Sequence, residues 1–273
     1  MIEKKIQFGI RNTGQNLWLP NNNPNEIVGW WRADVNSSLI TTGDSVNTWN
    51  NLMDNTKWSM QSDGGSATPD VGGVVNGEPV LTFVQPQRLA CSSQNTGKPK
   101  DGMMTVVTFS VIGAVDNGGD AIMSCEDNSN RFFSVNANDP TQFNGRFSQT
   151  GLGSNGMTYG LSGGPYLGNN IMATDLDFDT NTSRTRMNGT EVGSSSNYNT
   201  KLGNTNNFKM MANNVGNRQL AGSLGEMVVA IFPNGYTDSE EYIQKVEGYL
   251  AYKYGVQDLL PGLHPYKTQP PRE

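Results

Sequence analysis

The clearest pattern of hydrophobic and polar positions lies near the end of the chain, between residues 222 and 255. Its first part, from Met227 to Phe232, is a continuous apolar run that Pro233-Asn234-Gly235 ends. A short apolar run bounded by turn residues is typical of a buried strand rather than of a surface helix. The pattern therefore predicts a core strand over 227–232.

The residues after this strand change to a helical period. Thr237 and Glu240 have the spacing of a capping box, which marks the start of a helix. Lys253 suits the negative end of the helix dipole, and Gly255 suits a left-handed cap that ends the helix. Apolar side chains recur at intervals of three and four and form one stripe, namely Ile243, Val246, Leu250 and Tyr254.

Before residue 222 the pattern is that of many short strands joined by glycine- and asparagine-rich loops. The longest apolar run, 103–115, predicts a central core strand. Asn188-Gly189 predicts a two-residue hairpin, and Asn76-Gly77 predicts a second turn. Further strands are predicted at 27–31, 46–49 and 79–83, and near 120–125, 131–136, 143–148, 170–178, 184–193 and 207–212.

The two ends of the chain differ from this β-rich body. Ile2, Ile6, Phe8 and Ile10 lie at strand-like intervals, and an asparagine run at 21–25 separates them from the body. We therefore predict an N-terminal arm over 1–25, one domain over 26–260 and a proline-rich tail over 261–273. The arm either packs on its own domain or, as we favour, anchors or interlocks subunits. The tail is expected to begin with an ordered turn and to continue as loose chain.

Composition and charge mainly exclude classes of function. Only 16% of the 273 residues are charged, 32 are glycine and the net charge is −6, a composition that suits short strands and polar loops. A nucleic-acid reader concentrates Lys and Arg on one face, and this chain has no basic run, so we expect no nucleic acid as partner. No apolar stretch is long enough to span a membrane. The first residues lack the apolar region of a signal peptide, so synthesis in a cytoplasm is expected.

The few cysteine and histidine residues limit which disulfide, metal and catalytic sites the chain can form. Cys91 and Cys125 are expected to be reduced and buried, although a pairing between them stays open. The single histidine, His264, excludes a His-cluster metal site and a Ser/His/Asp or Cys/His machinery within one chain. We interpret His264 as a hydrogen-bonded structural residue of a turn.

Segments at both ends of the body carry a resemblance to a known family. They are Trp30 to Asp34, Val46 to Asn51, Asn76 to Phe83, Met187 to Thr190, Gly225 to Val229 and Leu260 to Tyr266. With them the chain resembles the concanavalin A-like lectin/glucanase superfamily, specifically the laminin-G-like jelly rolls of bacteriophage and bacterial surface proteins. The resemblance implies that the first and last strands pair, which would place Trp30-Trp31 near the strand at 226–232. We expect an all-β fold, a two-sheet antiparallel jelly-roll sandwich with one C-terminal α-helix and an extended N-terminal arm.

The first candidate for chemistry is a set of three aspartates, Asp175, Asp177 and Asp179. Alternate residues of a strand share a face, so these carboxylates would lie about 7 Å apart. The superfamily's retaining glucanases also carry carboxylates on a strand, with nucleophile and general acid about 5–5.5 Å apart, but they use glutamates. We favour a solvated polar face opposite Leu176 and Phe178. A cation site and catalysis are the alternatives.

Other candidate binding residues lie in loops. The oxygen-rich loops at 116–120 and 126–128 would suit Ca²⁺, although such clusters are more often simple turns. Tyr159, Tyr166 and Tyr198 would form a stacking platform for a sugar, or, in the favoured interpretation, cap the edges of the sandwich. Large apolar side chains are expected in the core, namely Trp30, Trp31, Trp49, Met210 and Met211.

The leading functional hypothesis is a non-enzymatic bacteriophage virion surface protein, made in the host cytoplasm and located in the virion as a capsid decoration protein, head fibre or tail-associated adhesin. Its expected partners are the major capsid protein or the tail, further copies of itself with a trimer favoured, and a host-surface glycan. No cofactor is expected, with Ca²⁺ as the exception that the acidic loops leave open. A carbohydrate-binding module is the alternative, and a glycoside hydrolase using Asp175, Asp177 and Asp179 is the third hypothesis.

Overall fold

A computed structural model of the chain describes residues 16–22, 27–54, 58–63, 70–84, 87–91, 102–111, 120–126, 131–139, 142–146, 168–177, 180, 182–195, 207–212, 221–232 and 239–273. The elements in these ranges are almost all strands, which confirms the predicted all-β fold with one helix near the C-terminus. The strands are β1 (Ile27–Arg32), β2 (Leu39–Thr42), β3 (Ser45–Trp49), β4 (Met60–Ser62), β5 (Asp70–Val75), β6 (Glu78–Phe83), β7 (Leu89–Cys91), β8 (Gly102–Val111), β9 (Asp120–Glu126), β10 (Arg131–Asp139), β11 (Gln142–Arg146), β12 (Gly168–Asp177), β13 (Thr182–Met187), β14 (Thr190–Ser195), β15 (Asn207–Met210) and β16 (Gly222–Phe232). The helices are α1 (Ser239–Lys253) and three short 3-10 helices, η1 (Pro20–Asn22), η2 (Asn36–Ser38) and η3 (Gln257–Leu259).

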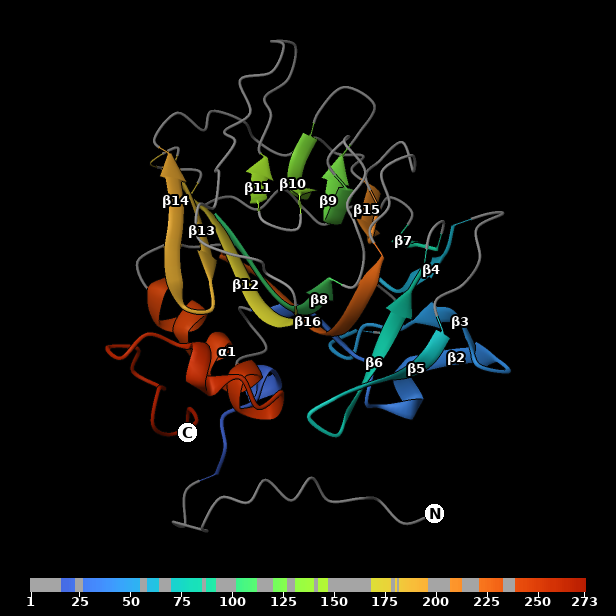
Figure 1. Cartoon of the computed structure of the whole chain (residues 1–273), viewed down its shortest axis with the longest axis horizontal. Coiled ribbons are helices and arrows are strands. Elements are labelled where there is room, and N and C mark those ends of the chain that lie inside the picture. Colours follow the sequence, from blue (N-terminus) through green and yellow to red (C-terminus); the bar gives the residue numbers. More distant parts are fainter. Residues whose placement is uncertain are drawn as a thin grey trace.

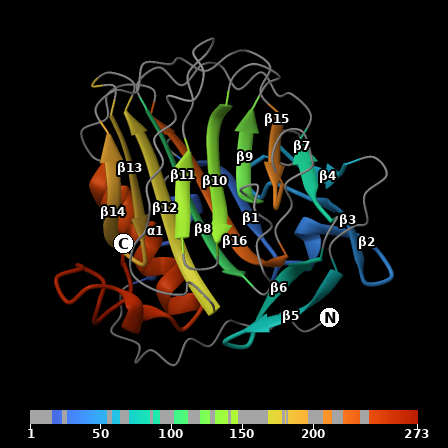
Figure 2. The ribbon, with the colours of Figure 1, turned by 45° about the horizontal axis from the view of Figure 1, so that its top comes forward.

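Hydrogen bonds join the strands into one sheet, which folds over on itself to form layers. The order is β11-β10-β9-β15-β7-β4-β3-β5-β6-β16-β8-β12-β13-β14, with β1 on β16 and β2 on β3. Strands β16, β8, β12, β13 and β14 form what we call the central layer, and they pair antiparallel. Helix α1 covers one face of the central layer, and β9, β10 and β11 lie on the other side (Figures 1 and 2). This layering is that of a β-sandwich with a helix added outside.

The first and last strands of the body pair, as the resemblance implies. Trp30 lies opposite Val228 and Trp31 opposite Met227 in the antiparallel ladder between β1 and β16. Because neighbouring residues of a strand point to opposite faces, the two tryptophans enter different cores. Trp30 packs on the α1 side, whereas the ring of Trp31 contacts that of Trp58. Both tryptophans are buried, as is Trp49, which confirms the predicted core positions.

Helix α1 is attached to the central layer through its predicted apolar stripe. Ile243, Val246 and Leu250 are fully buried, and burial of each such side chain stabilises the fold by about 1.5–3 kcal/mol. The strand residues of the same core are Trp30, Val80, Ile171, Ala173, Val228 and Ala230. Gly255 has φ +65°, so the predicted left-handed end of the helix is confirmed. The capping residue Thr237 lies outside the described ranges.

The two predicted Asn-Gly turns are both confirmed. Asn76-Gly77 joins β5 to β6, with Val75 opposite Glu78. Asn188-Gly189 joins β13 to β14, with Met187 opposite Thr190. All four turn residues have positive φ, which is the signature of a type I′ hairpin turn.

The strand register separates the two cysteines. Phe208 of β15 lies opposite Cys91 of β7 on one side and opposite Cys125 of β9 on the other. The two cysteines are therefore two strand spacings apart, about 9–10 Å, which is beyond the reach of a disulfide. Cys91 is buried, and burial raises the pKa of its thiol to about 11. The open alternative of a Cys91–Cys125 disulfide is thus excluded within one chain.

Residues near both ends of the chain meet on the outside of α1. Leu17 forms a β-bridge with Arg272, the Trp18 N–H donates to the Pro271 carbonyl at 3.1 Å, and the Glu273 N–H donates to the Asn16 carbonyl at 3.1 Å. We call residues 16–22 and 270–273 the terminal clasp. The expectation of a loose tail is wrong for these residues, because Pro270 and Pro271 are buried and the backbone pairs with the other end. In residues 16–22, the arm packs on its own domain, with Trp18 against Tyr249.

Candidate functional site

Asp175, the first of the three predicted aspartates, lies beneath helix α1 and not on an open face. It shares a face of β12 with Ile171 and Ala173, which belong to the core under α1. Its side chain is only 2% exposed. The favoured interpretation of a solvated polar face is therefore wrong for Asp175, because the helix covers the surface that the strand pattern left open.

An arginine from the neighbouring strand compensates the buried charge of Asp175. Arg184 lies directly opposite Asp175 in the β12–β13 ladder, and its Nη2 is 2.7 Å from Asp175 Oδ2. Arg184 Nε is also 3.0 Å from the same oxygen, and Nη1 reaches Glu240 Oε2 of α1 at 2.9 Å. The carboxylate thus already has a cation partner and joins sheet to helix.

The other two aspartates do not complete a metal site in the described ranges. Asp177 accepts hydrogen bonds from the Thr180 N–H at 3.1 Å and from Thr180 Oγ1 at 2.5 Å. Asp179 lies outside the described residues. Among the residues whose placement is described, no group of three or more His, Cys, Asp or Glu is arranged to hold a metal ion. The role of the full set therefore stays a prediction.

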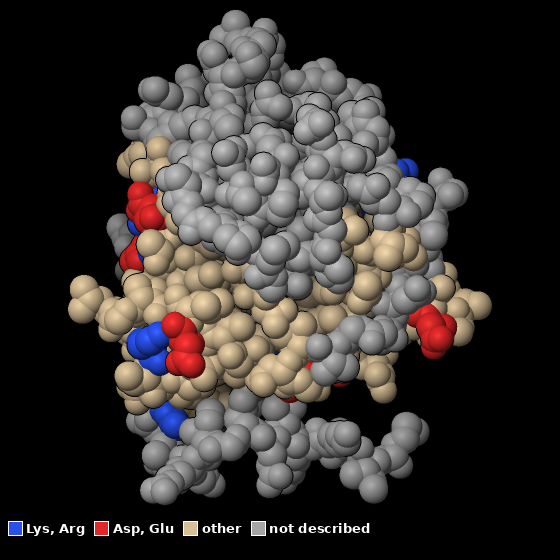
Figure 3. Space-filling model, in the orientation of Figure 1, with Lys and Arg blue, Asp and Glu red and all other residues tan. Residues whose placement is uncertain are grey.

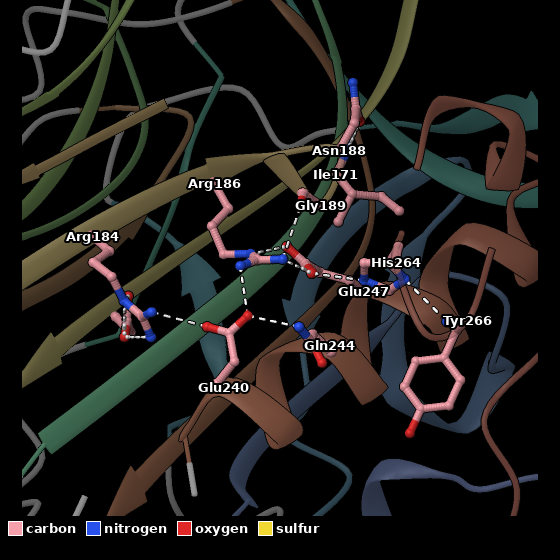
Figure 4. Close-up of polar contacts among 11 residues, drawn as sticks. Ile171, Arg184, Arg186, Asn188, Gly189, Glu240, Gln244, Glu247, His264 and Tyr266 are labelled. Atoms are coloured by element: carbon pink, nitrogen blue, oxygen red, sulfur yellow. Dashed lines mark hydrogen bonds and ion pairs between the residues drawn. The ribbon is translucent and has the colours of Figure 1, made fainter. Parts of the chain in front are cut away.

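A second charge network joins the β13–β14 hairpin to helix α1 (Figure 4). Arg186 Nε is 2.9 Å from Glu247 Oε1, Nη1 is 2.8 Å from Glu240 Oε1, and Nη2 donates to the Gly189 carbonyl at 2.8 Å. Burial acts to lower the pKa of Arg186, but the charges of Glu247 and Glu240 outweigh it and raise that pKa above its usual value. Arg186 is therefore fixed as a cation between sheet and helix.

His264 closes this network on the side of the C-terminal loop. Its Nε2 lies 3.1 Å from Glu247 Oε2, and its Nδ1 accepts the Tyr266 N–H at 3.2 Å. The side chain is only 1% exposed. The predicted structural role of His264 is confirmed.

A third network, which the sequence analysis missed, surrounds Lys253 at the other end of α1. Lys253 Nζ contacts Glu226 Oε2 and lies 2.9 Å from Asp34 Oδ1, and none of the Lys253 side chain is exposed. Arg32 Nη2 is 2.5 Å from Asp34 Oδ2, and Trp30 Nε1 donates to Glu226 at 2.5 Å. Lys253 follows Val246 and Leu250 at helical spacing, so its position in the apolar stripe was the available signal.

The electrostatics of the third network are balanced within the protein interior. Burial acts to raise the pKa of Asp34, but the Arg32 hydrogen bond and the charge of Lys253 outweigh it and hold that pKa below its usual value. Two cations and two carboxylates thus neutralise one another next to the ring of Tyr249. Such an arrangement fixes the orientation of these four side chains and resists the exchange of their partners. It does not place an acid and a base beside an open space.

Several predicted site residues lie outside the described ranges. They are the proposed sugar platform Tyr159, Tyr166 and Tyr198, and the proposed arm residues Ile2, Ile6, Phe8 and Ile10. For the calcium loops, the backbone of β9 is informative. Asp120 and Glu126 begin and end that strand, which sets them about 20 Å apart, so these two residues cannot bind the same ion.

The visible surface carries few charges on its described part. In Figure 3 the described residues are mostly uncharged, and the Lys, Arg, Asp and Glu that appear lie in small separate groups. No basic stripe runs across the described part of this face. Helix α1 is too short to cross a bilayer, and no other described helix is long and apolar enough to do so.

Comparison with known proteins places the fold. No protein-family model matches the chain, and no curated protein matches it. Among solved structures, the binding domain of Paraclostridial Mosquitocidal Protein 1 superposes with a TM-score of 0.57 at 9% identity, covering 82% of this chain and 53% of that one. The binding domain of Botulinum Neurotoxin DC, solved in complex with SialylT, superposes with a TM-score of 0.55 at 7% identity, covering 82% and 52%. A Trypanosoma rangeli sialidase superposes with a TM-score of 0.50 at 10% identity, covering 75% of this chain and 30% of that one.

These similarities concern the fold. The chain spans about half the length of the two toxin structures and less than a third of the sialidase. They confirm the β-sandwich that the family resemblance implies. The bacteriophage context of that resemblance stays a prediction.

Proposed function

We propose that the protein is a non-enzymatic, lectin-like binding domain whose ligand is a glycan. The observation that carries this proposal is the superposition of more than four-fifths of the chain on toxin binding domains. One of them was solved in complex with SialylT. Fold likeness alone does not fix function, so the proposal needs a direct binding test.

The ion pairs described above favour binding over hydrolysis. Asp175, which the hydrolase hypothesis needs as a free carboxylate, is held by Arg184 at 2.7 Å. Retaining glycosidases need two carboxyl groups on either side of the scissile bond, with space for a sugar between them. A buried carboxylate already bound by arginine does not offer that space.

A glycan array that includes sialylated glycans such as SialylT tests the ligand class. Tyr159, Tyr166 and Tyr198 are the proposed contacts, and each Tyr→Ala variant should weaken binding about fivefold, the loss of roughly one aromatic contact. Tyr252→Phe on helix α1 is the matched control and should bind as the unmodified protein does. The array is run with Ca²⁺ and with a chelator, because the sequence leaves open a Ca²⁺ site at the loop 116–120. Absence of binding to every glycan would overturn the glycan proposal.

We further propose that this domain is displayed on a bacteriophage particle, attached through its N-terminal arm. The support is the resemblance to phage jelly rolls and the strand-like spacing of Ile2, Ile6, Phe8 and Ile10. The structure sharpens the test, because residues 16–22 belong to the terminal clasp and must be retained. Deletion of residues 1–15 should abolish attachment to particles and the expected trimer while leaving glycan binding unchanged. If attachment and oligomeric state survive the deletion, the arm has no such role.

A further inference from the structure

The two described Asn-Gly turns hold their asparagine side chains in different ways. Asn188 Oδ1 accepts the Ile171 N–H at 2.8 Å, and its Nδ2 donates to Asn170 Oδ1 at 3.0 Å. The Asn188 N–H also donates to the Ile171 carbonyl at 2.7 Å (Figure 4). Asn76 is exposed, and its Nδ2 lies 3.5 Å from the Lys253 carbonyl, at the long limit of a hydrogen bond. The amide of Asn188 is therefore held at both of its ends, whereas that of Asn76 is held by a long contact.

The glycines that follow the two asparagines differ in the same direction. Gly189 is buried, and an added Cβ would lie 3.0 to 3.1 Å from side-chain atoms of Leu260, Pro261 and His264. Gly77 is exposed, and no described atom lies within 4 Å of the corresponding point. Rotation of the Asn-Gly peptide is therefore obstructed at Gly189 and unobstructed at Gly77.

An asparagine followed by glycine can lose ammonia without an enzyme. The Gly77 backbone nitrogen attacks Asn76 Cγ, so that a C–N bond forms and the Cγ–Nδ2 bond breaks. The proton lost by the Gly77 nitrogen balances the one that the departing amide nitrogen takes up as ammonia, and nothing is oxidised or reduced. Water then opens the cyclic succinimide at either carbonyl and leaves aspartate or isoaspartate. Glycine favours the attack because no Cβ hinders the approach of its nitrogen.

The side chain of Asn76 lies against the end of helix α1. A Cβ added to Gly255, which ends the helix in a left-handed conformation, would be 2.5 Å from Asn76 Nδ2. Lys253 is the last residue of α1, so its carbonyl lies at the negative end of the helix dipole. An amide can present an N–H to this carbonyl, whereas an ionised carboxylate has only acceptors and adds a negative charge.

We propose that Asn76 is a site of spontaneous modification, where deamidation turns the contact between the β5–β6 hairpin and the end of helix α1 from attraction to repulsion. The hydrogen bonds and packing of Asn188-Gly189 protect the second turn from the same reaction. Further Asn-Gly pairs begin at positions 117, 144, 155 and 234, and the proposal concerns the two pairs whose side chains are described. It is independent of the glycan proposal.

Peptide mass spectrometry of the aged full-length protein tests the site. Trypsin cleaves after Lys57 and Arg88, and peptide 58–88 contains Asn76 as its only asparagine. Peptide 187–201 contains Asn188, and fragmentation locates the gain of one mass unit within it. In mildly alkaline buffer, conversion at Asn76 should be faster than at Asn188 by at least about tenfold, because two hydrogen bonds of the Asn188 amide must break first.

The unfolded chain is the matched control for this comparison. In guanidinium chloride the two asparagines should convert at similar rates, since both precede glycine and the fold no longer holds either side chain. The product at Asn76 should contain both aspartate and isoaspartate, which chromatography separates, because direct hydrolysis of the amide would give aspartate alone. Equal rates in the folded protein, a rate difference that persists in the denaturant, or aspartate without isoaspartate would each overturn the proposal.

The variant Asn76→Asp tests the consequence at helix α1. Aspartate tolerates the left-handed backbone much as asparagine does, so the substitution changes mainly the charge. Its folding equilibrium constant should be about two- to fivefold lower than that of the unmodified protein, the effect of a like charge at a helix end, and the difference should shrink at high salt. Urea unfolding at low and high salt measures both effects. Unchanged stability, or a loss that salt does not reduce, would refute the repulsion.

Discussion

Lys253 shows at the scale of one residue how far the interior depends on paired charges. It is fully buried with Glu226 and Asp34, and Arg32 supplies the second cation. Removal of one partner from such a set leaves an uncompensated charge inside the protein. The sequence analysis assigned Lys253 only to the negative end of the helix dipole, although its helical spacing from Val246 and Leu250 places it on the buried stripe.

Lys253→Met should therefore destabilise the fold by about 3–5 kcal/mol, the range for a broken buried ion pair. The measurement is the midpoint of urea unfolding at constant slope. Lys245→Met is the matched control on the same helix, because its partner Glu241 is exposed and such surface pairs contribute at most about 1 kcal/mol. Equal shifts in the two variants would contradict the role assigned to Lys253.

Asp34 makes the contribution of the same network to stability depend on pH. Its pKa lies below the usual range because Arg32 and Lys253 outweigh the effect of burial. The unfolded chain, with an Asp pKa of about 3.9, then takes up the proton first, so the carboxylate contributes stability above that value and loses it as pH falls through the folded pKa. The difference in unfolding free energy between the unmodified protein and Asp34→Asn should be largest near neutral pH and shrink below about pH 4. Urea unfolding at a series of pH values measures it, and a constant difference would refute the assignment.

At the scale of elements, the two Asn-Gly turns share one backbone conformation in different surroundings. Gly77 and Gly189 have φ +82° and +79°. An added Cβ at Gly77 would contact nothing, whereas at Gly189 it would lie 3.0 Å from His264 Cδ2 and from Pro261 Cδ. Substitutions at Gly77 and Gly189 therefore separate the cost of backbone strain from the cost of side-chain packing.

Gly77→Ala should cost about 1–2 kcal/mol, from the left-handed conformation alone. Gly189→Ala should cost about 1 kcal/mol more, because overpacking against Pro261 and His264 is added. Thermal unfolding of both variants measures the difference. An equal loss of stability at the two turns would mean that Pro261 and His264 move aside for the methyl group without cost.

These elements also show what could be predicted from sequence. The helix stripe and the two turns depend on local spacing, and the structure has them where the pattern predicts. Asp175 was misjudged because period two assigns a residue to a face but does not say what covers that face. Glu226 was missed for a related reason, since a single acid in an apolar strand acquires meaning only when the distant Lys253 is placed beside it. The predicted tyrosine platform depends on loops for which spacing carries little information.

At the scale of the whole molecule, the terminal clasp holds the two ends of the described chain on helix α1. Trp18 is buried there against Tyr249, and Pro271 accepts its backbone N–H. The C-terminal residues thus pair with the backbone on both sides of a buried aromatic residue that is distant in sequence.

Deletion of residues 270–273 should expose Trp18 and remove two backbone hydrogen bonds, each worth about 0.5–1.5 kcal/mol. The expected result is a lower unfolding temperature and a red shift of tryptophan emission that disappears in a Trp18→Phe background. Thr268→Ala, at an exposed position just before the deleted residues, serves as control. Unchanged emission after the deletion would show that other groups cover Trp18.

The clasp also means that Asn16 and Glu273 are already neighbours, joined through the Glu273 N–H and the Asn16 carbonyl. A short linker could therefore close the described polypeptide into a ring without bending any element. New ends could then be opened at Asn76-Gly77, where the turn is exposed. In such a circular permutant every strand would keep its neighbours, while the order in which the strands are synthesised would change. The β-sandwich is therefore defined by the contacts between its strands rather than by the place where the chain starts.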